Sequence, residues 1–199
     1  MSEDNPQVIV IAGPNGAGKT TLAPFLLRDA LKLREYVNAD PIALGLSGFD
    51  PGSVSFQAGR VMLERLHELA SQRRTFAFES TLAARHYAGW IRRLQAAGYS
   101  FQLMFLWLRT DELAVRRVNE RVNSGGHYVA EEVVRRRYKA GCENFWNLYQ
   151  PSADTWAVFD NSTTPGPLLL ATGSQKEVSS VPVPSSWRDF ASGHQQERD

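Results

Sequence analysis

The eight residues GPNGAGKT at positions 13–20 constrain the fold of this chain more than any other feature. They match the phosphate-binding loop pattern, in which a glycine and four free positions are followed by Gly-Lys and a hydroxyl residue. Glycines let the backbone turn tightly and bring successive N–H groups onto phosphate oxygens. Residues 8–12 are apolar and β-branched like a buried strand, and residues 21–29 follow a helical pattern. This context favours nucleotide binding over an incidental glycine-rich turn.

The loop also predicts individual contacts to ATP and magnesium. Lys19 is expected to hold the β and γ phosphates, and the hydroxyl of Thr20 is expected to bind the magnesium ion that bridges them. The predicted nucleotide-binding residues are Gly13, Asn15, Gly16, Ala17, Gly18, Lys19, Thr20 and Thr21. ATP and Mg²⁺ are therefore the predicted cofactors, although the loop alone does not say what happens to the γ-phosphate.

Short apolar runs alternate with helical patterns along the chain, which is typical of a parallel sheet covered by helices. We expect strands near residues 36–38, 75–78, 99–108 and 155–159, and an edge strand at 168–170. The predicted fold is a single-domain α/β, P-loop kinase-like fold with three layers, a mostly parallel sheet and a helical lid. The predicted parts are a polar segment at 1–7, the kinase-like domain at 8–172 with its lid at about 111–140, and a loosely attached Ser/Pro-rich tail at 173–199.

Composition narrows the range of partners. The 199 residues carry a formal net charge of +1, which offers no general attraction to nucleic acid or to membranes. Cys142 is the only cysteine, so neither an intramolecular disulfide nor a cysteine-based metal cluster is expected. Residues 1–7 are polar, and no apolar run is long enough to cross a bilayer. We therefore expect a cytoplasmic protein.

Polar side chains follow two predicted strands at the edge where the P-loop lies. Asp40 follows the strand near 36–38, and Glu79 and Thr81 follow the strand near 75–78. Ligands of open parallel sheets bind beyond the carboxyl ends of the strands, so these residues are expected to converge on the P-loop. An unpaired carboxylate at Glu79 would be costly to bury, so a metal, a substrate hydroxyl or a base should hold it. Asp40 before Pro41 also fits a simple turn, and Thr81 also fits a helix cap.

Two groups of arginines flank a diglycine and predict a lid. Arg116, Arg117 and Arg121 precede Gly125 and Gly126, and residues 135–137 are all arginine. Such charges also fit a solvated helix face, but phosphoryl transfer needs a cover that places guanidinium groups near the developing charge. The helical stripe through Val134 and Tyr138 places Arg136 opposite the core, free to reach a ligand. His127 fits a phosphate contact and a helix end equally well.

Several of these segments together resemble the zeta toxin family of P-loop kinases. The matching segments are residues 13–20, Asn38-Ala39-Asp40, Glu79-Ser80-Thr81-Leu82, Arg117-Val118, Arg121-Val122, Gly125-Gly126-His127 and Arg135-Arg136-Arg137-Tyr138. The similarity extends from about residue 8 to residue 161. It implies ATP-dependent phosphorylation of a sugar hydroxyl, in the best-known members the 3′-hydroxyl of UDP-N-acetylglucosamine.

The resemblance also implies roles for individual residues. Asp40 matches the catalytic base, Glu79 and Thr81 match substrate contacts, and Arg121 matches a phosphate-contacting arginine. The second such contact corresponds to His127, Arg135 or Arg136, and Arg136 is our choice for a catalytic role. We assign the metal to Thr20 and Glu79. His127 is assigned to the substrate.

The predicted function is that of an ATP- and magnesium-dependent kinase acting on a hydroxylated small molecule such as a nucleotide sugar. Two alternatives fit the same residues. One is a phosphotransferase that acts on an antibiotic or another hydroxylated metabolite. The other is an NTP-dependent regulatory switch with a protein partner, and the resemblance makes an antitoxin a candidate partner. Stimulation of ATP loss by small acceptors would favour a kinase, and stimulation by a protein alone would favour a switch.

Overall fold

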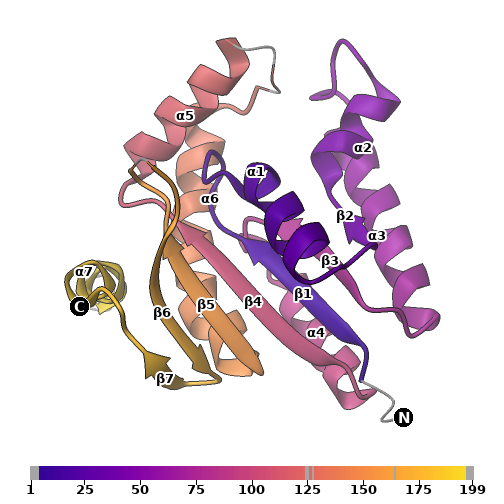
Figure 1. Cartoon of the computed structure of the whole chain (residues 1–199). Helices are drawn as coiled ribbons and strands as arrows, with labels where there is room; N and C mark the ends of the chain where they lie inside the picture. The colour runs from indigo at the N-terminus through magenta and orange to yellow at the C-terminus, as the bar shows by residue number, and fades with distance from the viewer. Residues whose placement is uncertain (1–4, 124–125, 127, 164, 196–199) are drawn as a thin grey trace.

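The computed structural model describes residues 5–123, 126, 128–163 and 165–195. Within these residues, seven strands form one sheet in the order β2-β3-β1-β4-β5-β6-β7 (Figure 1). The strands are β1 (Gln7–Ala12), β2 (Tyr36–Val37), β3 (Phe76–Ser80), β4 (Ser100–Trp107), β5 (Thr155–Asp160), β6 (Leu168–Ser174) and β7 (Glu177–Ser180). The pairings from β2 to β5 are parallel, and β6 and β7 add antiparallel.

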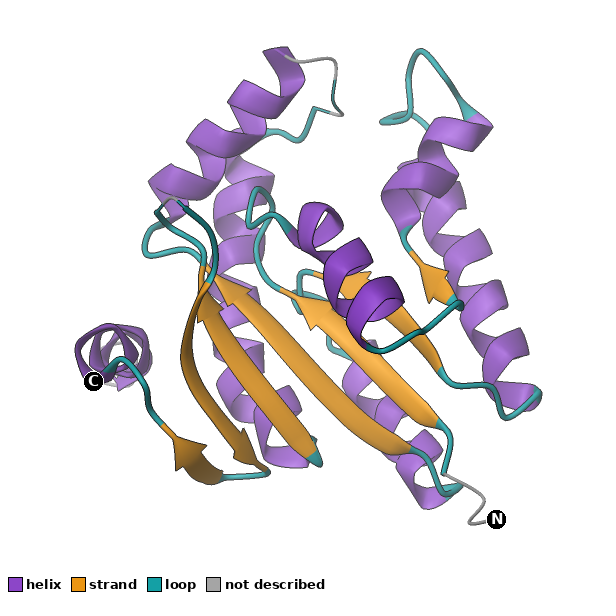
Figure 2. Cartoon of the chain, in the orientation of Figure 1, coloured by secondary structure: helices purple, strands orange, loops and turns teal. Residues whose placement is uncertain are grey.

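Helices lie on both faces of the sheet (Figure 2). The α-helices are α1 (Lys19–Ala23), α2 (Ala39–Leu46), α3 (Ser55–Ser71), α4 (His86–Ala96), α5 (Asp111–Asn123), α6 (Glu131–Asn144) and α7 (Pro184–Gln195). A π-helical segment, Pro24–Ala30, continues α1, and Phe145–Tyr149 continues α6 before the short 3₁₀ turn Gln150–Ser152. None of the described helices combines the length and the apolar character needed to cross a membrane.

The alternation of side chains along β1 explains the three layers. Val8 and Val10 belong to the larger buried cluster, which includes residues of α3, α4 and α7. Ile9 and Ile11 point to the other face and belong to a second cluster with residues of α1, α5 and α6. A strand buried on both faces is typical of parallel sheets with helices on each side. The predicted α/β, P-loop kinase-like architecture with a mostly parallel sheet is thereby confirmed.

The start of α2 differs from the sequence-based expectation. Asp40 was expected at a strand end, with Pro41 discouraging helix before it, but β2 ends at Val37 and Asp40 lies in the first turn of α2. Asn38 caps this helix, since its side chain accepts a hydrogen bond from the N–H of Asp40. Proline is tolerated in a first helical turn because N–H groups there have no partner within the helix.

The C-terminal part also differs, because it is packed rather than loosely attached. The strand expected at 168–170 extends to Ser174 and pairs with β5 and β7. Helix α7 buries Phe190, which is 4% exposed and packs on the rings of Phe105 and Trp107. Trp187 and Phe190 lie three residues apart and therefore share one helix face. Because Ser and Pro residues surround Trp187 and Phe190, the sequence pattern does not indicate this apolar helix face.

Candidate functional site

The P-loop leaves the carboxyl end of β1 and leads into α1, between α5 and α2 in Figure 1. Three of its glycines have positive φ, namely Gly13 (140°), Gly16 (76°) and Gly18 (83°). A Cβ atom on Gly13 would lie 2.2 Å from the carbonyl oxygen of Leu106 in β4. The loop therefore needs glycine for both its backbone conformation and its close approach to the sheet.

Lys19 is buried and lies against the P-loop. Its Nζ atom donates hydrogen bonds to the carbonyl oxygens of Gly13 and Pro14, both at 2.9 Å. Burial lowers the pKa of Lys19, although the nearby carboxylates of Glu79 and Asp40 act in the opposite direction. The ammonium group is thus held at the loop that the sequence predicts to bind phosphate.

Asn161 braces the P-loop from the end of β5. Its Nδ2 atom donates to the carbonyl oxygen of Ala17 at 2.9 Å. Arg117 of α5 donates in turn to the carbonyl oxygen of Asn161 at 2.7 Å. These two roles were not recognised in the sequence, where Asn161 resembles a turn residue. The sequence does place Asn161 directly after a predicted parallel strand. Because the carboxyl ends of parallel strands meet at the edge of the sheet where the P-loop lies, this position indicates a contact with the loop.

Asp40 faces α5 from the first turn of α2. Its Oδ2 atom lies 3.6 Å from Nη1 of Arg121 in α5. Both side chains are partly exposed, so this ion pair is weak and open to competition by a ligand. The predicted base and the predicted phosphate-contacting arginine therefore meet across the P-loop.

Glu79 is held by two hydroxyl groups. The Tyr36 hydroxyl donates to its Oε1 atom, and the Thr20 hydroxyl donates to its Oε2 atom at 3.2 Å. Burial raises the pKa of Glu79, while Lys19 and the two hydroxyl groups act in the opposite direction. The expectation that a metal, substrate or base must satisfy this carboxylate therefore needs revision, because Tyr36 and Thr20 already do so. The sequence does not single out Tyr36, because its hydroxyl reaches Glu79 only through the pairing of β2 with β3.

The segment after β3 has an unusual backbone. Leu82 is a buried non-glycine residue with φ of 58°. Asn144 of α6 donates to the carbonyl oxygens of Leu82 and Ala83, at 2.8 and 3.3 Å. Gly141 of α6 packs so closely that an added Cβ would lie 2.3 Å from the carbonyl oxygen of Thr81. Helix α6 thus braces residues 81–83, here called the Thr81 segment. Within this segment Leu82 has a left-handed conformation that is costly for leucine.

One cavity of about 940 Å³ joins these parts. Its lining comes from the P-loop, α2, α3, the Thr81 segment, α5 and α6. The predicted site residues in the lining are Asn15, Gly16, Gly18, Lys19, Thr20, Thr21, Asp40, Glu79, Thr81 and Arg121. Gly13 and Ala17 are not part of the lining. Gly13 lies against Leu106, and the carbonyl oxygen of Ala17 accepts the hydrogen bond from Asn161.

The structure brings a different arginine of α6, Arg137, to the cavity. Arg137 lines the cavity, whereas Arg136 is exposed and is not part of the lining. Burial lowers the pKa of Arg137, and the charge of Arg136 adds to this effect. Arg136 is exposed, as the apolar stripe of α6 predicts, but the cavity lies beside that stripe rather than opposite it. A residue next to Tyr138 therefore reaches it.

Arg135 joins α5 and α6 and is not part of the cavity lining. Its guanidinium lies within 2.9 Å of Asp111 and 3.1 Å of Glu112 in α5, and within 2.9 Å of Glu131 in α6. His127 and Gly125 lie outside the described residues, so their predicted roles stay predictions. The N–H of Gly126 donates to the carbonyl oxygen of Arg121 in α5 at 2.9 Å.

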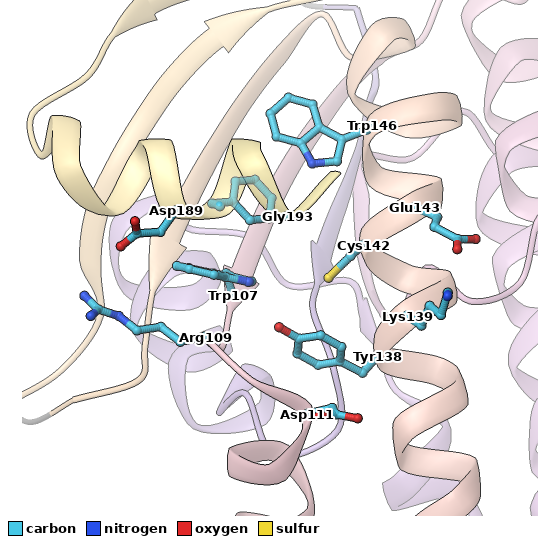
Figure 3. Close-up of a pocket in the computed structure, with 11 residues that line it drawn as sticks. Trp107, Arg109, Asp111, Tyr138, Lys139, Cys142, Glu143, Trp146, Asp189 and Gly193 are labelled. Carbon is cyan, nitrogen blue, oxygen red and sulfur yellow. The ribbon is translucent and has the colours of Figure 1, made fainter. Parts of the chain in front are cut away.

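A second, smaller cavity of about 310 Å³ lies between α6, α7 and the end of β4 (Figure 3). Trp107, Tyr138 and Trp146 line it, together with Arg109 and Asp189. Arg109 is bound to the buried carboxylate of Asp160 at 2.9 Å. None of the predicted site residues that the structure describes belongs to this lining.

The sheet order, the P-loop after β1, and the carboxylates and arginines at the same edge define a P-loop protein with a kinase-like fold. The family model for the AAA domain matches residues 8–145, more than half of the sequence, and the chain belongs to this family. An uncharacterized protein of Haemophilus influenzae is 30% identical over 132 residues, which are 66% of this chain and 92% of that protein.

Two solved structures share the fold. The crystal structure of AvrRxo1-ORF1:-ORF2 with ATP superposes with a TM-score of 0.77 at 18% identity, over 94% of this chain. The chain spans 64% of the length of that structure. A structure of the PezAT chromosomal toxin-antitoxin system of Streptococcus pneumoniae gives a TM-score of 0.65 at 14% identity, and covers 98% of this chain and 86% of that one.

Proposed function

We propose that this protein is an ATP- and magnesium-dependent kinase that transfers the γ-phosphoryl group to a hydroxyl of a small molecule. The observation that carries the proposal is the position of Asp40, whose carboxylate lines the same cavity as Lys19 and Thr20 of the P-loop. A carboxylate beside the phosphate-binding loop can accept the proton of an attacking hydroxyl. In the proposed reaction the acceptor oxygen bonds to the γ-phosphorus, the bond to the β-phosphate oxygen breaks, and Asp40 takes the proton.

The cationic side chains in the cavity support this reaction. Lys19, Arg121 and Arg137 approach from the P-loop, α5 and α6 respectively. Phosphoryl transfer depends mainly on positioning and on stabilising the charge of the phosphoryl oxygens. We therefore assign Arg137 the role that the sequence gave to Arg136. The ion pair between Arg121 and Asp40 would open when the acceptor hydroxyl approaches Asp40.

Magnesium fits the oxygen atoms near the P-loop. The Thr20 hydroxyl and a Glu79 carboxylate oxygen lie 3.2 Å apart. Mg²⁺ prefers oxygen ligands and usually binds through one or two protein groups together with phosphates and water. Among the described residues, no group of three or more His, Cys, Asp or Glu side chains is arranged to hold a metal. When bound, the ion would neutralise charge on the β and γ phosphates.

A nucleotide sugar such as UDP-N-acetylglucosamine is our proposed acceptor. The volume of about 940 Å³ lies near the upper end of the usual range for small-molecule pockets, which supports two ligands meeting in one cavity. Thr81 and Glu79 lie on the wall next to Asp40 and would contact the sugar. An antitoxin-like protein partner, as in the PezAT system, is a further proposal that rests on fold similarity alone.

The proposal is tested by incubating the protein with ATP, magnesium and a metabolite extract, and searching by mass for species that gain a phosphoryl group. The variant Asp40→Asn should keep its ATP affinity and lose phosphotransfer by about a hundredfold to ten-thousandfold, the usual contribution of a general base. Asp189→Asn, at an exposed position on α7, is the matched control and should be fully active.

Three results would count against the proposal or redirect it. If no acceptor in the extract is phosphorylated and only a protein accelerates ATP loss, the chain is a switch. If Asp40→Asn weakens magnesium-ATP binding and extra metal restores it, Asp40 is a metal ligand. If Asp40→Asn transfers phosphate at the normal rate, Asp40 has no chemical role.

A further inference from the structure

Four side chains next to the P-loop form a closed ring of hydrogen bonds. The Nδ2 group of Asn38 donates to the Thr20 hydroxyl and to the Tyr36 hydroxyl, each at 3.3 Å. Each hydroxyl donates onward to a different oxygen of the Glu79 carboxylate. Both amide hydrogens, both hydroxyl groups and both carboxylate oxygens are therefore used.

The ring joins three parts of the chain that are distant in sequence, namely α1, β3 and the segment from β2 to the start of α2. Thr20 lies in α1, Tyr36 in β2 and Glu79 in β3, while Asn38 lies directly before α2. Asn38 is 7% exposed, so a donor left without a partner here would cost free energy.

The other end of the Asn38 side chain fixes α2. Its Oδ1 atom accepts a hydrogen bond from the N–H of Asp40 at 2.9 Å, as in a helix N-cap. The orientation of the amide is therefore determined on both sides, since only the NH₂ group can donate to the hydroxyls and only the oxygen can accept from Asp40. One side chain thus links the P-loop threonine to the helix that carries the proposed base.

We propose that Asn38 is a positioning residue that holds Asp40 in register with the nucleotide site. This inference rests on the proposed kinase function. A displacement of about 1 Å in a reacting group can reduce the rate about a hundredfold, so a rigid link between α1 and α2 has a direct effect on transfer. When a nucleotide binds the P-loop, the reduced mobility of Thr20 is then passed through Asn38 to the first turn of α2.

The chemistry of the ring explains why asparagine is required. Aspartate would cap α2 equally well, but it has no hydrogens for the two hydroxyls and would place a second charge beside Glu79. Serine would also cap the helix, because its short hydroxyl suits an N-cap. Serine is too short to reach both Thr20 and Tyr36. The variant Asn38→Ser therefore keeps the cap and the charge while removing the ring.

The experiment measures ATP affinity, transfer kinetics and hydrogen exchange in Asn38→Ser. ATP affinity should stay within about threefold, whereas kcat should fall about tenfold to a hundredfold. In the wild-type protein, ATP should slow the exchange of amides in the P-loop and in residues 39–43. In the variant, ATP should protect the P-loop alone. Asn147→Ser, at an exposed position, is the matched control and should behave like the wild type.

Unchanged kcat together with unchanged ATP-dependent protection of residues 39–43 would overturn the inference. If Asn38→Ser does not fold, Tyr36→Phe breaks one arm of the ring and leaves the cap intact. It should show a smaller loss of the same protection, and wild-type protection would count against the ring. The exchange measurement needs only ATP, so it remains valid if the wild-type protein phosphorylates no acceptor and the kinase proposal itself fails.

Discussion

Lys19 is a residue of the candidate site whose burial is unfavourable for its own charge. Its ammonium is buried and depends on two carbonyl oxygens of the loop for hydrogen bonds. Burial lowers its pKa, which means that the charged form is held in an environment that disfavours it. A buried charge of this kind is typical of residues that act on a ligand.

The variant Lys19→Ala should therefore bind ATP more weakly and lose transfer at the same time. Loss of charged hydrogen bonds to phosphate should cost about 1.5 to 3 kcal/mol, equivalent to about a tenfold to hundredfold weaker affinity by calorimetric titration. Lys176→Ala, at the exposed turn between β6 and β7, serves as the control. Unchanged affinity in Lys19→Ala would remove this residue from the nucleotide site.

Among the elements, α6 has two roles at the site. Its middle brings Arg137 to the cavity, and its last turn braces the Thr81 segment through Gly141 and Asn144. A movement of this helix would therefore change the positions of Arg137 and of the Thr81 segment, both of which line the cavity, at the same time.

The variant Gly141→Ala tests this second role of α6. Its Cβ atom would lie 2.3 Å from the carbonyl oxygen of Thr81, so the backbone of the segment must shift. We expect a loss of about 1 to 3 kcal/mol in the free energy of unfolding, as for an overpacked core. The KM for the acceptor should rise while the ATP affinity stays the same. Gly193→Ala, a helical glycine with nothing within 4 Å of an added Cβ, should be neutral or stabilising, and equal effects in both variants would contradict the bracing role.

The elements also show what can be predicted from sequence. The P-loop, the parallel strands and the convergence of Asp40, Glu79 and Thr81 depend on local patterns and on the general geometry of parallel sheets. The choice between Arg136 and Arg137 depends on where the cavity lies relative to α6, which a helical pattern does not encode. Likewise, Tyr36 becomes visible only when β2 is placed beside β3.

At the scale of the whole molecule, the packing of the C-terminal part also depends on tertiary contacts that a local sequence pattern does not encode. Helix α7 looks polar in sequence, and its apolar face is recognised only through its contacts with β4 and with the π-helical segment Phe145–Tyr149. The domain division at residue 172 therefore remains a prediction about organisation, while the expectation of loose attachment does not hold for residues 173–195.

Buried tyrosines should make the whole fold sensitive to alkaline pH. Burial raises the pKa of Tyr36, Tyr138 and Tyr149 above the ordinary value of 10.0. As the pH rises, these tyrosines therefore ionise in the unfolded chain before they ionise in the folded protein. Their contribution to the free energy of unfolding is fully present below about pH 10 and falls as the pH rises further. Tyr149 is fully buried, and while it stays protonated in the folded state the free energy of unfolding should fall by about 1.4 kcal/mol per pH unit. Tyr36 and Tyr138 are partly exposed and should contribute less.

Denaturant titrations between neutral and alkaline pH should show this decline. The variant Tyr149→Phe should reduce the slope above pH 10, because it removes one of the ionising groups. An equal slope in wild type and variant would mean that Tyr149 ionises in the folded state as readily as in the unfolded chain.

The distribution of tryptophans decides what optical measurements on this protein can report. Trp146 and Trp156 both pack against Trp187 of α7, with ring centroids 5.6 and 5.9 Å apart, and Trp107 packs on Phe190 of the same helix. Among the described residues, the lining of the P-loop cavity contains no tryptophan. The fifth tryptophan, Trp90, lies elsewhere, against His67 and Phe78. Intrinsic fluorescence will therefore report mainly on the docking of α7 and on unfolding. Detecting nucleotide binding by fluorescence will need a labelled ligand or an introduced fluorophore.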